Sequence, residues 1–259
     1  MQMKIAICGI LGKMGREIVK VAYEKKIKIV AGIEKEEFKN ESPKKIFNIE
    51  YDFPILSAPE DLDKIQEKPD IIVDFSQPGV IIPFIEHCTK NNLKIGFVIG
   101  TTGFSKEQEE KIKELSEKTP IFMSSNMSRG INLLLKILPE IKKNLPDFDV
   151  EIVEIHHRMK KDSPSGTALK LADVLGGKRV FGREGIAGPR QKDEIGVFAV
   201  RGGDVVGDHT VFFLGDGERI EITHRASSRR VFAIGAIKAA EMIYEKLKEG
   251  KKGLFSSMF

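Results

Sequence analysis

The chain has 259 residues, of which 41% are hydrophobic and 31% charged, and its formal net charge at pH 7 is +4. These values exclude a disordered chain and are typical of one large domain or two modest ones, each able to bury a core. Charges of both signs are mixed along the chain, so we expect no nucleic-acid binding, whereas small anionic substrates would suit the mild positive balance.

The cysteines and the apolar segments predict a cytoplasmic protein. Cys8 and Cys88 lie in no Cys-x-x-Cys pair and near no histidine cluster, so we expect buried thiols without a disulfide framework or a zinc site. No apolar run approaches the roughly 20 residues that span a bilayer, so we expect no membrane partner. The apolar residues 5–11 are too few for a signal peptide and are better interpreted as a first strand.

The chain opens with the pattern of a strand, a helix and a second strand. We expect the strands at residues 4–8 and 27–33 and the helix at residues 13–24. The turn after the first strand carries the pattern G-x-x-G-x-x-G, with Gly9, Gly12 and Gly15.

This strand–helix–strand unit is the arrangement that binds a dinucleotide. Glycines permit the turn, the pyrophosphate lies on the helix N-terminus, and an acidic residue after the second strand binds the ribose hydroxyls. Glu34 stands at that position and favours NAD(H), because its carboxylate repels a 2′-phosphate, whereas the adjacent Lys35 would attract that phosphate. We therefore expect NADH and/or NADPH as cofactor. The alternative is a glycine-rich turn without a ligand.

Strands and helices continue to alternate as far as Asn126. We expect strands near residues 51–56, 70–75, 94–99 and 121–124, and helices over residues 80–91 and 106–118. The strand at 94–99 ends in the turn Gly100-Thr101-Thr102-Gly103, where open parallel sheets bind ligands. A plain turn before the next helix is the alternative there.

The pattern changes after Asn126. We expect a helix over residues 131–145 interrupted by Pro139, and a glycine-rich loop without periodicity over residues 176–195. From Gly196 onward, turn signals separate several β segments, and a final helix follows over residues 231–247. Its alanine-rich face should pack on the sheet of the first domain.

These elements predict an α/β fold with two domains. Residues 1–127 with 231–259 would form a Rossmann-type, parallel-sheet dinucleotide-binding domain. Residues 128–230 would form an α+β domain for substrate binding and oligomerisation, with a mixed, mainly antiparallel sheet.

Residues 151–171 carry the densest chemistry, E-I-V-E-I-H-H-R-M-K-K-D-S-P-S-G-T-A-L-K-L. A strand, a basic loop and a helix capped by Ser165 follow one another, and the backbone N–H groups of Gly166 and Thr167 are placed to donate to an anion. Lys160 and Lys161 add positive charge. The alternatives are a solvated basic loop before an ordinary helix, and a metal site at the two adjacent histidines, which lacks a carboxylate or cysteine at ligand spacing.

A nicotinamide domain joined to an anion site predicts hydride transfer to a small acid. Reduction of a C=C or C=N bond needs a proton source, and His156 suits that role because histidine titrates near neutral pH. Lys160 would hold a carboxylate or share the proton, and Thr167 would clamp a carboxylate. His157 would point to the opposite side if the strand persists to it, which indicates a binding role.

The motif E-I-V-E-I-H-H-R-M-K-K-D-S-P-S-G-T-A closely resembles the signature of the dihydrodipicolinate (4-hydroxy-tetrahydrodipicolinate) reductase family. The resemblance spans essentially the whole chain and includes I-C-G-I-L-G-K-M-G-R, G-T-T-G-F, S-N-M-S-R-G-I-N, R-G-G-D-V-V-G-D-H-T-V and E-I-T-H-R-A-S-S-R-R-V-F-A-I-G-A. It implies an NAD(P)H-dependent oxidoreductase that makes tetrahydrodipicolinate in the diaminopimelate route of lysine biosynthesis, and a homotetramer joined through the sheets of its second domains.

The resemblance also implies roles for individual residues. Catalysis falls on His156 and Lys160, and binding of a small dicarboxylate substrate falls on His157, Ser165, Gly166 and Thr167. Cofactor binding falls on four segments: Gly9, Ile10, Leu11, Gly12, Lys13 and Met14; Glu34 and Lys35; Gly100, Thr101 and Thr102; and Ser124, Ser125, Asn126 and Met127. No metal is expected.

Three positions depart from the usual family pattern. Ser163 replaces the usual alanine, Asp208 the usual glutamate, and Lys35 a frequent arginine, which leaves the choice between NADH and NADPH open. Two other functions remain alternatives: a different two-domain NAD(P) dehydrogenase, and a protein that senses the nucleotide without chemistry.

Overall fold

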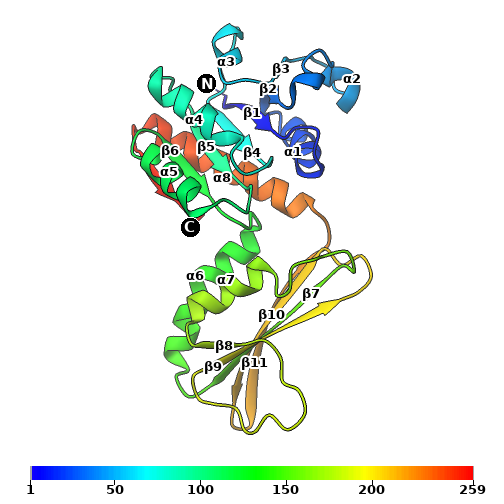
Figure 1. The fold of residues 1–259 in the computed structure, drawn as a ribbon, viewed down its shortest axis with the longest axis vertical. Coiled ribbons are helices and arrows are strands. Elements are labelled where there is room, and N and C mark those ends of the chain that lie inside the picture. Colours follow the sequence, from blue (N-terminus) through cyan, green and yellow to red (C-terminus); the bar gives the residue numbers. More distant parts are fainter. Residues whose placement is uncertain (1, 259) are drawn as a thin grey trace. The chain divides into compact units, whose positions relative to one another are not determined.

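The computed structural model describes residues 2–258, which form two compact units. Unit 1 comprises the residues up to Met127 together with Phe232–Met258, and unit 2 comprises Ser128–Val231. Figure 1 shows their elements in sequence colours. Residues 1 and 259, the outer limits expected for the first domain, lie outside the described residues. No helix within residues 2–258 is long and apolar enough to cross a membrane.

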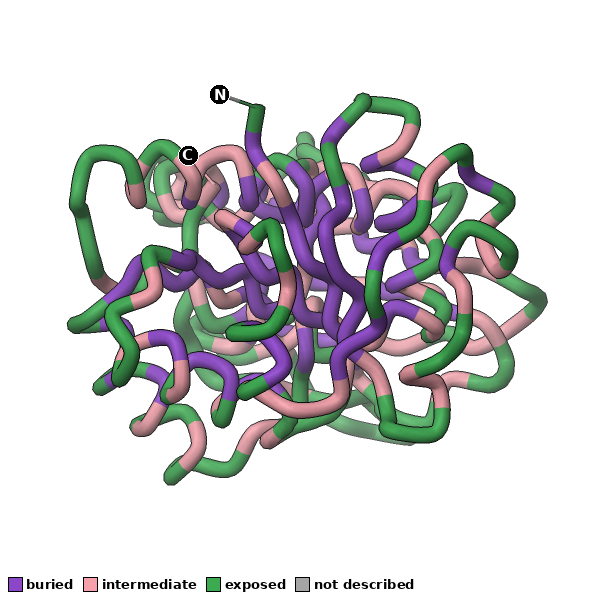
Figure 2. The backbone as a smooth tube through the Cα atoms, turned by 90° about the horizontal axis from the view of Figure 1, so that it is seen from above, coloured by how far each residue is buried: buried purple, intermediate pink, exposed green. Residues whose placement is uncertain are grey.

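Unit 1 is built on a parallel sheet of seven strands in the order β12-β6-β5-β4-β1-β2-β3. The strands are β1 (Lys4–Cys8), β2 (Lys28–Ile33), β3 (Ile55–Leu56), β4 (Ile71–Asp74), β5 (Gly96–Ile99), β6 (Pro120–Met123) and β12 (Gly253–Phe255). Their sequences are nearly continuous apolar runs because helices cover both faces of a parallel sheet. In Figure 2 these strands form a buried layer inside more exposed segments.

The helices of unit 1 divide between the two faces of this sheet. They are α1 (Lys13–Glu24), the 3-10 helix η1 (Glu36–Phe38), α2 (Pro43–Phe47), α3 (Asp61–Lys64), α4 (Ile81–Lys90), α5 (Lys106–Ser116) and most of α8 (Arg230–Lys248). Side chains of α1 and α8 share one apolar core with the strands, and those of α4 and α5 share the other. The alanines of α8 are buried in the first core, as the sequence predicted.

Unit 2 contains a mixed sheet of five strands in the order β11-β10-β7-β9-β8. The strands are β7 (Asp149–His156), β8 (Lys178–Val180), β9 (Glu194–Arg201), β10 (Gly207–Gly215) and β11 (Glu218–Ala226). β10 runs antiparallel to β7 and β11, whereas β9 runs parallel to β7 and β8. Helices α6 (Arg129–Asn144) and α7 (Gly166–Leu175) pack against one face.

Two expectations for unit 2 were wrong in detail. Helix α6 continues through Pro139, because Leu134 and Leu138 before the proline and Ile141 after it all pack against the core. These contacts hold the helix across the missing backbone donor. The segment 176–195 is not entirely loop, since its residues Lys178–Val180 form the edge strand β8.

Candidate active site

The segments expected to bind the cofactor follow β1, β2, β5 and β6. In a parallel sheet the carboxyl ends of all strands lie at one edge, and these four strands lie within the run β6-β5-β4-β1-β2. The structure therefore brings the four segments to the edge where open α/β sheets bind ligands. Of the fifteen residues, five are exposed and four are buried. The exposed ones are Gly12, Lys13, Lys35, Thr102 and Ser125, and the buried ones are Ile10, Thr101, Ser124 and Met127.

The glycine turn after β1 has no room for side chains. Gly9 has φ of +73°, and a Cβ on it would lie 2.6 Å from the carbonyl oxygen of Phe75. A Cβ on Gly15 would overlap the carbonyl oxygen of Gly9, so α1 approaches β1 closely. Helix α1 begins after Gly12 without a side-chain cap, which leaves its N-terminal end open to a phosphate.

The acidic residue after β2 lies against this turn. The Glu34 Oε2 accepts a hydrogen bond of 3.2 Å from the backbone N–H of Leu11, and Oε1 accepts one of 3.2 Å from Lys35. A carboxylate beside an uncapped helix start, behind glycines that exclude side chains, fits the ribose and pyrophosphate of a dinucleotide. The residues present therefore suit a nicotinamide dinucleotide.

A segment after β4 was missed by the sequence reasoning. Asp74 is fully buried and accepts from the hydroxyl of Ser76, whose backbone N–H donates to Thr101 Oγ1 at 2.9 Å. Burial raises the pKa of Asp74. This contact joins the loops after β4 and β5, so Thr101 supports the edge from inside instead of facing solvent.

The last cofactor segment is held by α8. Ser124 Oγ donates to the Asn126 carbonyl at 2.9 Å, and a Cβ on Gly235 of α8 would overlap the carbonyl oxygen of Met127. Only glycine allows α8 to approach the chain there. The backbone of residues 124–127 is thereby fixed at the carboxyl end of β6.

In unit 2, β7 places Glu154 and His156 on the sheet face that α6 and α7 cover, because side chains alternate along a strand. The loop after β7 leads to Ser165, which caps α7 by accepting from Ala168 N–H at 3.2 Å. Gly166 is exposed, and a Cβ on it would meet no atom within 4 Å. The first turn of α7 is therefore open to a ligand.

Glu154 is the centre of this site. It has 0% exposure, and its Oε2 lies 2.6 Å from His156 Nδ1. Its Oε1 accepts the Ser165 backbone N–H at 2.9 Å, and Arg201 donates to both oxygens at 2.8 Å. Burial acts to raise the pKa of Glu154, but the hydrogen bonds from Arg201 and His156 bring it below the ordinary value. Glu154 is therefore an anion.

His156 is neutral in this setting. Burial lowers its pKa, and the charges of Lys160 and Arg201 act in the same direction, which outweighs the opposing hydrogen bond to Glu154. An anionic Glu154 requires a proton on Nδ1, so the lone pair is on Nε2. A Cβ on Gly207 would lie 2.9 Å from that Nε2, so only glycine leaves space for the ring.

A second buried histidine supports the same helix. His209 Nε2 lies 3.1 Å from Ser165 Oγ, and its ring packs edge-on against His156 with 5.2 Å between centroids. Burial lowers the pKa of His209 to about 3. A neutral His209 can contact the cap serine without opposing the proton on His156.

The basic loop holds the remaining expected residues. Lys160 Nζ lies 2.9 Å from Asp162 Oδ1. This ion pair orients the Lys160 ammonium group within the loop between β7 and α7. β7 ends at His156, so the alternation that would turn His157 to the opposite side does not reach it, and the His157 N–H donates to the Val205 carbonyl at 2.8 Å. Thr167 lies half-buried in the first turn of α7.

Comparison with known proteins identifies the family. Residues 3–127 match the family model for the N-terminus of dihydrodipicolinate reductase, and residues 130–258 match that for its C-terminus. The chain is 44% identical to the 4-hydroxy-tetrahydrodipicolinate reductase of Aquifex aeolicus, covering 100% of this chain and 98% of that protein. It is 43% identical to the reductase of Methanocaldococcus jannaschii, covering 95% and 94%. The chain belongs to the dihydrodipicolinate reductase family.

A solved structure of this family has the same fold. The dipicolinate-bound dihydrodipicolinate reductase from Paenisporosarcina superposes with a TM-score of 0.77 at 27% identity, covering 100% of this chain and 98% of that one. The family is one of oxidoreductases, and its Rossmann-type domain takes a nicotinamide cofactor.

Three residues of the candidate site were not predicted from the sequence. Glu154 carried a signal, because it stands two positions before His156 and therefore on the same face of a strand. Arg201 and His209 stand in the family motif R-G-G-D-V-V-G-D-H-T-V, but the sequence did not indicate their place in the site, since they reach it only through the pairing of β7 with β9 and β10.

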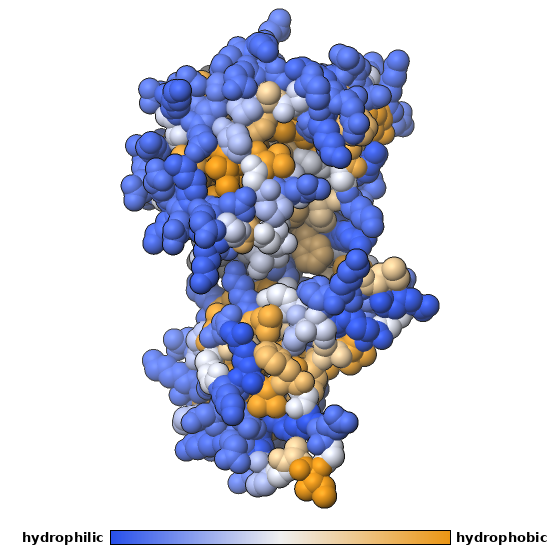
Figure 3. Space-filling model, in the orientation of Figure 1, coloured by the Kyte–Doolittle hydropathy of each residue, from blue (hydrophilic) through white to orange (hydrophobic). Residues whose placement is uncertain are grey.

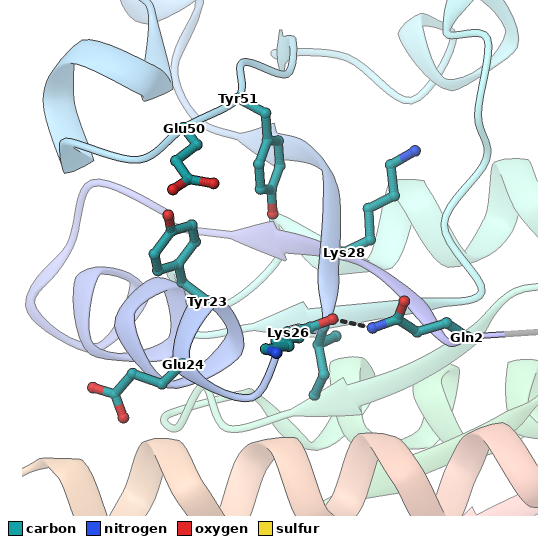
Figure 4. A pocket seen from close by; sticks show the side chains of 8 residues that line it. Gln2, Tyr23, Glu24, Lys26, Lys28, Glu50 and Tyr51 are labelled. Carbon is teal, nitrogen blue, oxygen red and sulfur yellow. Dashed lines mark hydrogen bonds between the residues drawn. The ribbon is translucent and has the colours of Figure 1, made fainter.

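Two other features of the structure lie outside this site. Within residues 2–258, no group of three or more His, Cys, Asp or Glu side chains is arranged to hold a metal ion. A pocket of about 660 Å³ lies at the amino end of β2, with Tyr23 and Tyr51 on one side (Figure 4). The Tyr51 hydroxyl accepts the Ile29 N–H there at 3.2 Å, so this tyrosine completes the hydrogen bonding of β2.

Proposed function

We infer that this chain reduces 4-hydroxy-tetrahydrodipicolinate (dihydrodipicolinate) to tetrahydrodipicolinate with NAD(P)H, in the diaminopimelate route of lysine biosynthesis. The match to both halves of the reductase family over nearly the whole chain carries this inference. A coupled assay tests it: dihydrodipicolinate synthase supplies its product, and the loss of NADH or NADPH absorbance is followed. If neither NADH nor NADPH is oxidised, the proposal is wrong.

His156 is the proposed proton donor, and Lys160 with the first turn of α7 would hold the substrate. Bound nicotinamide supplies the hydride. The related reductase whose structure contains dipicolinate supports a dicarboxylate ligand. One carboxylate would be bound by the backbone N–H groups at Gly166 and Thr167, and Lys160 and His157 would contact the other polar groups. Two carboxylates near His156 would favour its charged form, so substrate binding would prepare the proton donor.

Replacing His156 tests this role. We expect His156→Ala to lower kcat by roughly 10² to 10⁴-fold, as for loss of a general acid, while NADH affinity changes by a few-fold at most. Met159→Ala is the matched control, because Met159 lies in the same segment and is 77% exposed. Unchanged turnover in His156→Ala would exclude the proton-donor role.

For the cofactor, we propose that NADH is used and NADPH tolerated. The position of Glu34 beside the glycine turn supports a contact with the ribose hydroxyls, and the exposed Lys35 supports tolerance of a 2′-phosphate. Glu34→Ala should shift the ratio of kcat/KM toward NADPH, with Glu37→Ala as an exposed neighbouring control. An unshifted ratio would mean that Glu34 does not reach the ribose.

We also propose a cytoplasmic homotetramer joined through unit 2. No helix of residues 2–258 covers the sheet face opposite α6 and α7. This face carries half-buried or exposed apolar side chains: Val153, Ile155, Phe198, Val200 and Phe212. In Figure 3 hydrophobic residues reach the surface of both units. Light scattering should give four times the chain mass, and Val200→Glu should lower it. A monomeric wild type would contradict this assembly.

A further inference from the structure

The wild-type site contains one buried carboxylate that serves two functional groups at once. Glu154 makes four hydrogen bonds: one with the imidazole of His156, one with the backbone N–H of Ser165, and two with Arg201. His156 and Ser165 belong to different elements, the end of β7 and the cap of α7. Glu154 therefore links the proposed proton donor to the proposed carboxylate clamp through hydrogen bonds.

We propose that Glu154 is a positioning residue that sets the tautomer of His156 and fixes the first turn of α7, so that proton donor and clamp form one rigid unit. The proposal rests on the proposed reductase activity and deepens its active site. Because the Glu154 carboxylate accepts the hydrogen bond from His156 Nδ1–H, Nε2 is the ring nitrogen that carries and releases the catalytic proton. Because Glu154 also accepts the hydrogen bond from the Ser165 backbone N–H, it fixes the position of the first turn of α7 relative to Nε2.

Arg201 gives this arrangement its electrostatic balance. Its guanidinium binds both oxygens of Glu154, so the pair is neutral as a whole and the anion does not hold His156 permanently protonated. The other charged or titratable groups near His156 are Lys160 in the basic loop and His209 on β10. Helix α7 contributes the Ser165 and Ala168 N–H groups and no charge in its first turn.

Glutamine at position 154 separates positioning from simple packing. Because Arg201 donates to both oxygens of Glu154, the amide N–H₂ would face Arg201 in either orientation, together with either the Ser165 N–H or His156 Nδ1. Only the contact with His156 can adapt, by moving the imidazole proton from Nδ1 to Nε2. We expect Glu154→Gln to reverse the tautomer, to lower kcat at least 100-fold and to raise KM for the substrate. The alkaline limb of the kcat–pH profile should move to lower pH, because an anion next to His156 is lost.

Arg201→Gln should move the same limb in the opposite direction. It removes a positive charge and leaves Glu154 to favour protonated His156. Loss of a merely structural ion pair would not shift the two profiles in opposite directions. Equal shifts in one direction would overturn the proposal.

The same strand provides a matched control. Glu151 is also buried and bound by arginines, Arg183 and Arg190, but its side chain lies on the opposite face of β7. Glu151→Gln removes an equivalent ion pair without touching His156 or α7. We expect it to retain the wild-type kcat–pH profile, and a loss equal to that of Glu154→Gln would overturn the proposal.

The decisive readout does not require turnover. Nitrogen chemical shifts of ¹⁵N-labelled His156 report the tautomer, and we expect the Nδ1–H form in the wild type and the Nε2–H form in Glu154→Gln. An Nε2–H tautomer in the wild type would overturn the inference even in an active enzyme. If the coupled assay fails while the tautomer is as expected, the proposed function is wrong and the positioning role of Glu154 stands.

Discussion

Helices α6 and α7 of unit 2 begin alike. Each is capped by a serine, Ser128 or Ser165, whose hydroxyl accepts the backbone N–H three residues later. Each hydroxyl also meets a histidine of the sheet, at 2.9 Å for His224 and 3.1 Å for His209. These histidines are directly opposite each other on β10 and β11. The two helix starts are therefore anchored to one row of the sheet.

The space in front of the two helices differs. A Cβ on Gly130 in α6 would lie 2.6 Å from His224 Cδ2, whereas a Cβ on Gly166 in α7 would meet nothing within 4 Å. The start of α6 is filled by the sheet, and the start of α7 is left open beside Glu154 and His156. A serine cap and a helix dipole are thus insufficient for an anion site, because unfilled space at the first turn decides which terminus accepts a ligand.

Substitution of the two glycines should give the largest difference in stability between the two helix starts. Gly130→Ala forces the half-buried His224 ring to move, and we expect a loss of about 1–3 kcal/mol in the free energy of unfolding. Gly166→Ala should cost nothing in stability and should alter only substrate KM. Urea unfolding and steady-state kinetics measure both. Equal destabilisation by the two substitutions would refute the difference in space.

Acid should weaken both anchors. The pKa of His209 is lowered by burial to about 3, and that of His224 is also lowered by burial. In the unfolded chain histidine titrates near 6.5, so the unfolded state binds more protons between those values. Stability is therefore intact above about pH 6.5 and falls below it, by up to about 1.4 kcal/mol per pH unit for His209.

Urea unfolding at several pH values between 5 and 8 would measure this slope. His209→Gln removes the titrating group and should flatten the dependence on pH, whatever its cost at pH 8. The same slope in this variant and in the wild type would assign the acid sensitivity to other groups.

The smallest effect should come from the caps themselves. Ser128→Ala and Ser165→Ala each remove one cap bond, and we expect similar losses of about 1 kcal/mol in the free energy of unfolding. Only Ser165→Ala should also raise KM for the substrate, since only α7 is open. Thermal unfolding together with kinetics gives both quantities. A KM effect of the same size in Ser128→Ala would remove the functional distinction between the helices.

The parallel sheet was predictable from the sequence because its signals are local. The buried runs of β1 and β4 are continuous and apolar, and the glycine turn follows β1 directly, so pattern and function coincide. The short helices α2 and α3 were missed, since elements of four or five residues show no period. The edge strand β12 was also missed, because only its pairing with β6 makes it a strand.

The candidate site was predictable only where it is local. His156, Lys160 and Ser165 lie within ten residues of each other in the sequence, so their chemistry stood out together. Arg201 and His209 lie more than forty residues from Glu154, and nothing in the sequence states the strand register that brings them to it. Because Arg201 and His209 stand on separate β segments, the sequence did not indicate that both lie near Glu154 in the fold.

The return of α8 and β12 to the first sheet has a consequence for synthesis of the chain. Unit 2 is built from contiguous residues, whereas unit 1 receives most of helix α8 and the edge strand β12 from residues 232–258. On the ribosome, unit 2 has all its elements before unit 1 is complete, and the face that α8 covers stays exposed until then. Unit 2 should therefore acquire its fold first during translation, and unit 1 should complete its fold last.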